Sequence, residues 1–355
     1  MGASVTVNNQ TVVHKDSDGT VVTSPDICIT PVGNAVLPIP YVNVAKSADT
    51  AGQITRGCAL SVADEQAPIQ LAPLYSGEPG SSSLLYDTDL VLEKPGTDCV
   101  LVGHAWAPQG KAPHVDVSFS VGEVRKQGRV FGERIWLKVL GAVSLSRPVP
   151  FEKIPLVWER AFGGADTSWQ EPAGHEFCLE NPVGVGLMAH KSRLVIDGLP
   201  LPNIENPSDL IKNPRQRPRP VGFGMIPPHW QPRAGYAGTY DDSWRKTVSP
   251  LPPADLDPRF YSAAAPGLVS QRYLTGSEGV LIEGAARQGR LQFSLPGIAL
   301  RATVRRRGGE EELPMRLDTV IVEPDNARLV LVWRGTINVH GQIHEIGPVR
   351  VGSRS

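Results

Sequence analysis

The sequence lacks long hydrophobic runs, has few cysteines and carries no excess of either charge. No apolar stretch approaches the roughly 18 residues that cross a bilayer, and the opening MGASVTVNNQTVVH has no basic segment followed by an apolar one. Four cysteines in 355 residues are too sparse for a disulfide framework, so we expect buried free thiols. Because the 35 basic side chains nearly balance the 36 acidic ones, the chain has no large net positive charge to attract nucleic acid or an anionic membrane. We expect a soluble cytoplasmic protein that binds neither.

Long amphipathic helices are also missing, and period-two alternation takes their place. The stretch 114–121 reads HVDVSFSV, in which valine or phenylalanine occupies every second position. The best helical windows, 151–161 and 208–212, are short. Further strands are expected at 99–107, 124–131, 134–140, 279–283, 291–295 and 298–304, and at 317–322 and 329–333 around a turn at 324–326. The sequence therefore predicts a mainly β fold, a sandwich or meander of short antiparallel strands with helix below about 20%.

A proline-rich region separates the two β regions. Residues 198–258 hold 13 prolines in 61 positions, too many for a helix or a central strand. A disordered linker would be poor in aromatic residues, yet Trp230, Tyr236, Tyr240 and Trp244 lie in this region. We expect an ordered loop region that packs on the β core through these four side chains. Asp241 and Asp242 are interpreted as turn or capping residues.

Motifs for chemistry are absent. The chain contains no phosphate-binding loop, no zincin helix and no nucleophile elbow, so we expect no cofactor. His340 and His344 have helical ligand spacing, but in an extended segment four residues span roughly 13 Å, which predicts no shared metal. An enzyme remains the alternative from another class, with a site in the loop region. It would draw on Glu159, His229, Tyr240 and Asp241.

Six motifs between residue 59 and the C-terminus resemble a known family. They are EQAPI (65–69), SSSLLYDTDL with EKPGTD (81–98), VWERAFGG (157–164), ENPVGVG (180–186), LPNIENP (201–207) and VGFGMIPPHWQPRAGYAGTYDDSWR (221–245). Their order is that of the bacterial domain-of-unknown-function family 2169. The resemblance implies a gene found beside type VI secretion spike genes and a role as an adaptor or chaperone for effector loading, and it carries over no catalytic activity.

A smaller block at residues 14–51 resembles the opening of PAAR-like domains, the proline- and glycine-rich cones that cap the same spike. The resemblance implies a zinc site of three histidines and a cysteine, of which this block offers His14 and Cys28 alone. Because a closed zinc site needs four ligands, we predict no metal. We place a PAAR-like segment at 1–53 and an adaptor-like β-rich domain at 54–355.

These features favour a non-enzymatic adaptor that couples a cargo effector to a VgrG-like spike protein in the bacterial cytoplasm, with export alongside the spike left open. The alternatives are a hydrolase or other enzyme, and a structural component of the spike tip. Residues 1–53 are too few to bury a core of their own, so they must pack either on the adaptor-like domain of the same chain or on the spike. The PAAR-like resemblance favours the spike, and we expect the segment to be dispensable for folding of the remainder. Expected protein-binding residues are Pro38, Pro40, Tyr41, Arg215, Arg217, Arg219, Trp230, Tyr236, Tyr240 and Trp244.

Overall fold

The chain is represented by a computed structural model. It describes residues 69–306, 308–338 and 349–353, together with the backbone of the strands between residues 4 and 62, and it describes side chains in 69–306, 308–336 and 349–352. Strands hold 38% of the residues and helices 8%, many of the strands being short and antiparallel. The predicted mainly β fold is therefore confirmed. In the described part of the chain, no helix is long and apolar enough to span a membrane.

The largest sheet contains the most deeply buried strands. Its order is β4 (Asp26–Thr30), β1 (Ser4–Asn8), β5 (Asn34–Ala45), β26 (Arg328–Asn338), β25 (Arg316–Glu323) and β9 (Asp98–Leu101), with β6 (Ser61–Val62) also on β5. Seven of the eight residues of β25 are buried, so this strand is covered on both faces. The turn at Pro324–Asn326 joins β25 and β26 into the hairpin that the sequence predicts.

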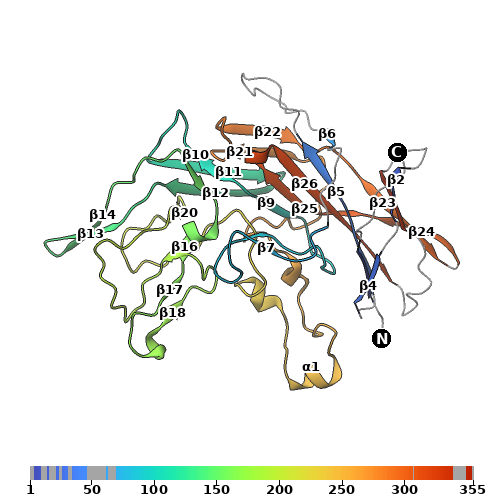
Figure 1. Cartoon of the computed structure of the whole chain (residues 1–355), viewed down its shortest axis with the longest axis horizontal. Helices are drawn as coiled ribbons and strands as arrows, with labels where there is room; N and C mark the ends of the chain where they lie inside the picture. Colours follow the sequence, from blue (N-terminus) through green and yellow to red (C-terminus); the bar gives the residue numbers. More distant parts are fainter. Residues whose placement is uncertain are drawn as a thin grey trace.

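Two five-stranded sheets complete the framework (Figure 1). One has the order β20 (Ile204–Glu205), β12 (Val124–Phe131), β11 (His114–Val121), β21 (Gly279–Glu283) and β22 (Arg290–Ser294). The other has the order β2 (His14–Lys15), β3 (Val21–Thr23), β27 (Val349–Ser353), β23 (Leu300–Arg306) and β24 (Gly309–Pro314). In β11 the valines and Phe119 are buried while His114 and Asp116 are exposed, which confirms the alternation.

Five two-stranded ribbons surround these sheets. They are β7 (Leu74–Tyr75) with β8 (Leu84–Tyr86), β10 (His104–Trp106) with β15 (Lys153–Pro155), β13 (Trp136–Val139) with β14 (Ala142–Leu145), β16 (Phe162–Gly163) with β19 (Val185–Gly186), and β17 (Ala165–Asp166) with β18 (Glu176–Phe177). A small second core, separate from the main one, underlies the β13–β14 hairpin. Its buried members are Trp136, Phe162, Cys178, Leu187, Leu201 and Ile211.

Neither of the two best helical windows of the sequence forms an α-helix. Residues 151–161 contain β15 and a single 3-10 turn, η1 (Trp158–Arg160), and residues 208–212 contain no helix. The one α-helix among the described residues, α1 (Asp242–Thr247), lies instead in the proline-rich region. Asp241 caps it by accepting a hydrogen bond from the Trp244 backbone N–H at 2.7 Å, as the capping interpretation predicts.

The N-terminal segment contributes three strands, β1, β4 and β5, to the largest sheet. β5 pairs antiparallel with β26 from Asn34↔Asn338 to Ala45↔Arg328. Where β5 carries Pro40 and Tyr41, the partner strand has one residue, so the register shifts; proline has no N–H to offer a ladder, and such positions become bulges. Of the two surfaces expected for residues 1–53, β5 therefore packs on the same chain and not on the spike that the resemblance favours. The domain boundary after residue 53 stays a prediction.

Candidate functional site

The aromatic residues expected to bind a protein divide between the surface and the core. An arm formed by residues 237–256 projects from the body and ends in α1, in yellow in Figure 1. On it the Tyr240 and Trp244 rings meet edge to face, with centroids 4.6 Å apart, and Tyr240 is 53% exposed. The base of the arm is closed by Thr239, whose N–H and hydroxyl donate to the Asp255 carboxylate at 3.0 and 2.7 Å.

Trp230 belongs to the main core and not to the surface. It is 1% exposed, and its ring lies edge to face against Trp158, with centroids 5.9 Å apart. The Trp158 indole N–H donates to the Met225 carbonyl at 2.7 Å. Trp230 therefore fastens the proline-rich region to the body, as expected, but its burial leaves no surface for a partner.

The three arginines expected to meet an acidic partner are exposed but differ in their contacts. Arg217 forms an ion pair with Glu176 at 2.5 Å, and Arg215 donates to the His190 carbonyl at 3.4 Å. The His190 backbone N–H, followed by the His190 ring and Arg217, lowers the pKa of Glu176 to about 2. Arg219 is exposed. Arg217 is thus committed within the chain, whereas Arg219 faces solvent.

The expected contact residues of the N-terminal segment, Pro38, Pro40 and Tyr41, lie on β5, and their side chains fall outside the described residues. Tyr236 is partly buried, with the Arg259 guanidinium 4.2 Å from its ring centroid. Among the predicted aromatic residues whose side chains the structure describes, Tyr240 is therefore the most exposed.

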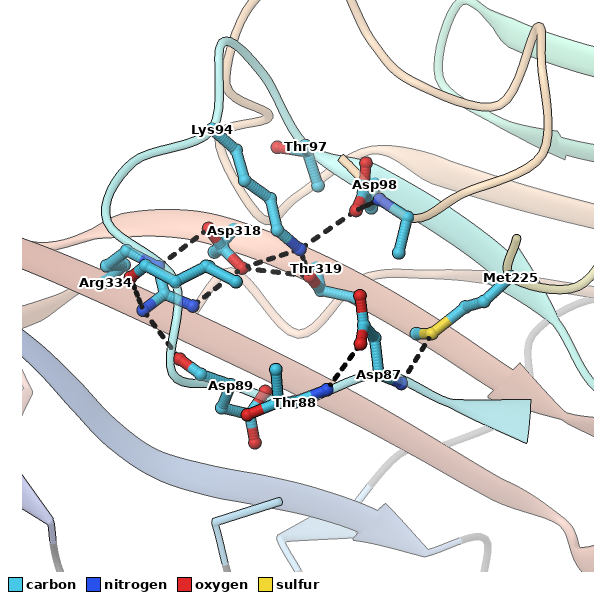
Figure 2. A network of polar contacts seen from close by, with 12 residues as sticks. Asp87, Thr88, Asp89, Lys94, Thr97, Asp98, Met225, Asp318, Thr319 and Arg334 are labelled. Atoms are coloured by element: carbon cyan, nitrogen blue, oxygen red, sulfur yellow. Dashed lines mark hydrogen bonds and ion pairs between the residues drawn. The ribbon is translucent and has the colours of Figure 1, made fainter. Parts of the chain in front are cut away.

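A buried ionic network links segments that lie far apart in the sequence (Figure 2). The Lys94 ammonium lies 2.9 Å from Asp98 Oδ2 and 3.1 Å from Asp318 Oδ2, and it donates to Thr319 Oγ1 at 2.8 Å. Arg334 Nε donates to Asp318 Oδ1 at 3.0 Å. Burial alone would raise the pKa of Asp318, but the Arg334 and Lys94 charges hold it well below its usual range. These ion pairs join the loop before β9 to β25 and β26.

A fourth ion pair, between Arg233 and Asp87, ties the proline-rich region to the segment that carries Asp89 and Lys94. Arg233 Nη2 lies 2.7 Å from Asp87 Oδ2, and both side chains are buried. The same guanidinium donates to the Ile226 and Phe260 carbonyls at 2.8 and 2.7 Å. Arg233 thereby clamps both ends of the stretch 226–260, so the arm projects from a fixed base.

Asp89 is the carboxylate of the cluster for which the described residues provide no ion-pair partner. It is half-buried and accepts a hydrogen bond from the Gln70 backbone N–H at 2.7 Å. Burial raises the pKa of Asp89 to about 6, although Gln70 and the charges of Arg334 and Lys94 oppose the rise. Arg334 donates to the Asp89 carbonyl and not to its carboxylate.

These residues border a cavity of about 210 Å³. Its lining comprises Gln70, Leu74, Tyr86, Asp87, Thr88, Asp89, Lys94, Met225, Tyr261, Ala263, Thr319, Ile321, Arg328, Val330 and Val332. Three of the four charged residues on its wall form ion pairs with residues behind the wall: Asp87 with Arg233, Lys94 with Asp98 and Asp318, and Arg328 with Glu323. The network therefore holds the fold together, and among the described residues Asp89 is the one charged group of this wall without an ion-pair partner.

The four residues proposed for an enzyme are not brought together. The Glu159 carboxylate accepts hydrogen bonds from the Ser83 backbone N–H at 2.8 Å, from the Ser83 hydroxyl and from the Ser76 hydroxyl at 3.1 Å. Tyr240 and Asp241 lie on the arm, and His229 packs against the neighbouring Trp230 ring. Within the described ranges, no hydrogen bond or ion pair links any two of the four. That the protein is not an enzyme stays a prediction.

A histidine that the sequence analysis did not single out lies beside a second cavity, of about 250 Å³. His104 Nδ1 is 2.7 Å from Asp325 Oδ2, and the Trp106 indole N–H donates to Asp325 Oδ1 at 2.7 Å. Ser83 also lines this cavity, but its hydroxyl is bonded to Glu159 and accepts the Trp158 backbone N–H at 2.7 Å. The Asp325 carboxylate can orient the His104 imidazole. The Ser83 hydroxyl, however, already has hydrogen-bond partners in Glu159 and Trp158.

In the residues that the structure describes, no three His, Cys, Asp or Glu side chains are grouped as metal ligands. Cys99 and Cys178 are free and buried, as expected, and burial raises the pKa of both thiols. Cys58, His340 and His344 lie outside the described residues, as do the side chains of His14 and Cys28.

One known protein family covers most of the chain. The family described as "Uncharacterized protein conserved in bacteria (DUF2169)" matches residues 44–334. The chain belongs to this family. A "Toxin PAAR-like domain" matches residues 19–60, which associates this DUF2169 protein with type VI secretion. No curated protein and no solved structure matches the chain.

The motifs that carry the family resemblance form much of the buried network. Asp87 and Asp89 belong to SSSLLYDTDL, Lys94 and Asp98 to EKPGTD, and Arg233 to the long motif at 221–245. Sequence reasoning missed this role because the partners lie up to 245 residues apart. The only local signal is the spacing of four residues between Lys94 and Asp98.

Proposed function

We propose that this DUF2169 protein is a non-enzymatic adaptor that holds a cargo effector in the bacterial cytoplasm and couples it to a VgrG-like spike protein of the type VI secretion system. The observation that carries the proposal is the union of two modules in one chain. A PAAR-like segment at 19–60 contains β5, which pairs with β26 of the DUF2169 region along its whole length. A cargo bound to the DUF2169 region would therefore be connected to the PAAR-like segment by a β-sheet and not by a flexible linker.

The distribution of polar and apolar groups supports an interaction protein. The buried charges of the main cluster are used in ion pairs between distant segments. Large apolar side chains are exposed on projecting elements, including Leu140 at 104% and Tyr240 at 53%. Exposed apolar groups of this kind are typical of protein contacts.

Export of the effector tests the proposal. In a strain that fires its type VI apparatus, deleting this gene is expected to abolish export of the effector encoded beside it, while the tube protein still reaches the medium. Restoring the wild-type gene should restore export. Effector export that is unchanged by the deletion would contradict an adaptor role.

The PAAR-like match also favours a second candidate function, a structural component of the spike tip. A tip component leaves the cell with the spike and is needed for firing itself. The same strains separate the two functions, because loss of the tube protein from the medium on deletion would indicate a tip component and retention would indicate an adaptor.

A further inference from the structure

The turn of the β13–β14 hairpin contains a leucine whose backbone conformation and solvent exposure are both unfavourable. Leu140 and Gly141 form a two-residue loop in which φ is +51° and +85°. Asn-Gly or Asp-Gly is typical of such a turn, because a bulky L residue at positive φ is strained. Leu140 is also fully exposed. Because the backbone conformation and the solvent exposure of Leu140 are both unfavourable in the isolated chain, this residue points to a contact with another molecule.

The outer edge of β13 is already occupied. The Trp136 backbone N–H donates to the Leu199 carbonyl at 2.9 Å, and the Lys138 backbone N–H donates to Asp197 Oδ1 at 2.7 Å. The loop at 197–199 therefore covers this side of the hairpin.

The outer edge of β14 is free. In the hairpin, Trp136 faces Leu145 and Lys138 faces Val143. Since Trp136 and Lys138 use their N–H groups outward, these two pairs are the non-hydrogen-bonded ones, and the N–H and C=O groups of Val143 and Leu145 also point outward. In the described part of the chain, none of these four groups has a hydrogen-bond partner.

The composition of the hairpin leaves this edge unprotected. Residues 135–146 read IWLKVLGAVSLS, with Lys138 as the single charge, and β14 itself carries none. Sheet edges are ordinarily blocked by charges, proline or a covering loop. Val139 and Val143 are 63% and 38% exposed beside the turn. Unpaired N–H and C=O groups along an edge are satisfied by another extended strand, and apolar neighbours select apolar side chains in it.

The hairpin lies at one end of the long axis of the molecule, and β2 and β4 of the N-terminal segment lie at the other (Figure 1). Resting on the proposed function, we propose that the β14 edge is the cargo site: an extended apolar segment of the effector adds to β14 as a strand, and Leu140 anchors it. Spike and cargo are then held at opposite ends of the adaptor.

Three variants of the full chain test this site against the purified effector encoded beside the gene. Leu140→Asn creates the Asn-Gly turn, so it should raise the urea midpoint of unfolding while weakening effector binding about tenfold or more. Val143→Pro removes an outward N–H without touching the hairpin ladder and should weaken binding similarly. Val195→Asn is the matched control, because Val195 is 76% exposed on the loop beside the other edge, and its binding should be unchanged.

Hydrogen exchange gives an independent readout of strand addition. Effector binding should slow exchange of the Val143 and Leu145 amides at least tenfold. Wild-type binding without this protection, unchanged binding by Leu140→Asn and Val143→Pro, or equal weakening by Val195→Asn would each overturn the β14 site and leave the adaptor function standing. A dimer of the chain that Val143→Pro dissociates would also overturn it, since the occupant would be a second copy. Failure of the wild-type chain to bind the effector would overturn both proposals.

Discussion

Replacing Asp89 by asparagine should stabilise this protein at neutral pH. The carboxyl is the unpaired acid of the buried network, and its pKa is raised from 3.8 to about 6, chiefly by burial. A rise of about two pKa units corresponds to about 3 kcal/mol of stability lost when the group ionises. Because the side chain is half-buried, solvent screening reduces the expected gain to about 2 kcal/mol. The asparagine oxygen can still accept the Gln70 backbone N–H.

The direction in which the free energy of unfolding changes with pH shows whether ionisation of Asp89 is the cause of the difference. A raised pKa in the folded state favours folding below the unfolded value of about 4, and that contribution is lost as the pH rises through about 6. Urea unfolding of wild-type and Asp89→Asn protein should therefore agree near pH 4 and differ by about 2 kcal/mol at pH 8. Equal stability at pH 8, or a variant less stable there, would refute the assignment of Asp89 as the excess buried charge.

Asp318→Asn is the matched control within the same network and should have the opposite effect. It leaves Lys94 and Arg334 buried without their shared counter-charge, which costs about 3–5 kcal/mol. The pKa of Asp318 is lowered in the folded protein, so its contribution is present at neutral pH and is lost as the pH falls through that lowered value. A neutral effect of Asp318→Asn at pH 8 would contradict the ion-pair geometry.

Three further predictions concern the fold. Trp230→Ala should cost about 3–5 kcal/mol in urea unfolding because Trp230 is a fully buried core residue, and a cost below about 1 kcal/mol would contradict its burial. Deleting residues 1–53 removes β5 from β26, so the truncated chain should become insoluble or melt at lower temperature, whereas a soluble chain of unchanged Tm would restore the independent domain that the sequence analysis expects. Asp241→Ala removes the cap of α1 at a local cost of about 1 kcal/mol; limited proteolysis should cut residues 237–256 faster at unchanged Tm, and an unchanged cutting rate would argue against the cap.

The strands were predictable where one face of the strand is buried and the other is exposed to solvent. The bounds of β11, β12 and β21 coincide with the predicted ranges, because alternation there follows directly from the pleat. The β25–β26 hairpin was predictable from its Pro-Asp-Asn turn.

The helices and the polar network were not predictable in the same way. The window at 151–161 has local helical spacing, but β15 pairs with β10 and overrides it. α1 is a six-residue helix inside a proline-rich stretch, too short for a periodic signal. The partners of Arg334 and Lys94 are fixed by tertiary structure, and no spacing rule connects residues more than 200 positions apart.

Reconstitution of the three proteins tests the central claim most directly. The spike protein, the effector and this chain are purified separately, and their mixtures are measured by size-exclusion chromatography with light scattering. The adaptor account predicts that the spike and the effector elute separately when mixed alone and elute as one ternary complex when the full chain is added. A spike–effector complex that forms without this chain, or a chain that binds only one of the two, would contradict the account.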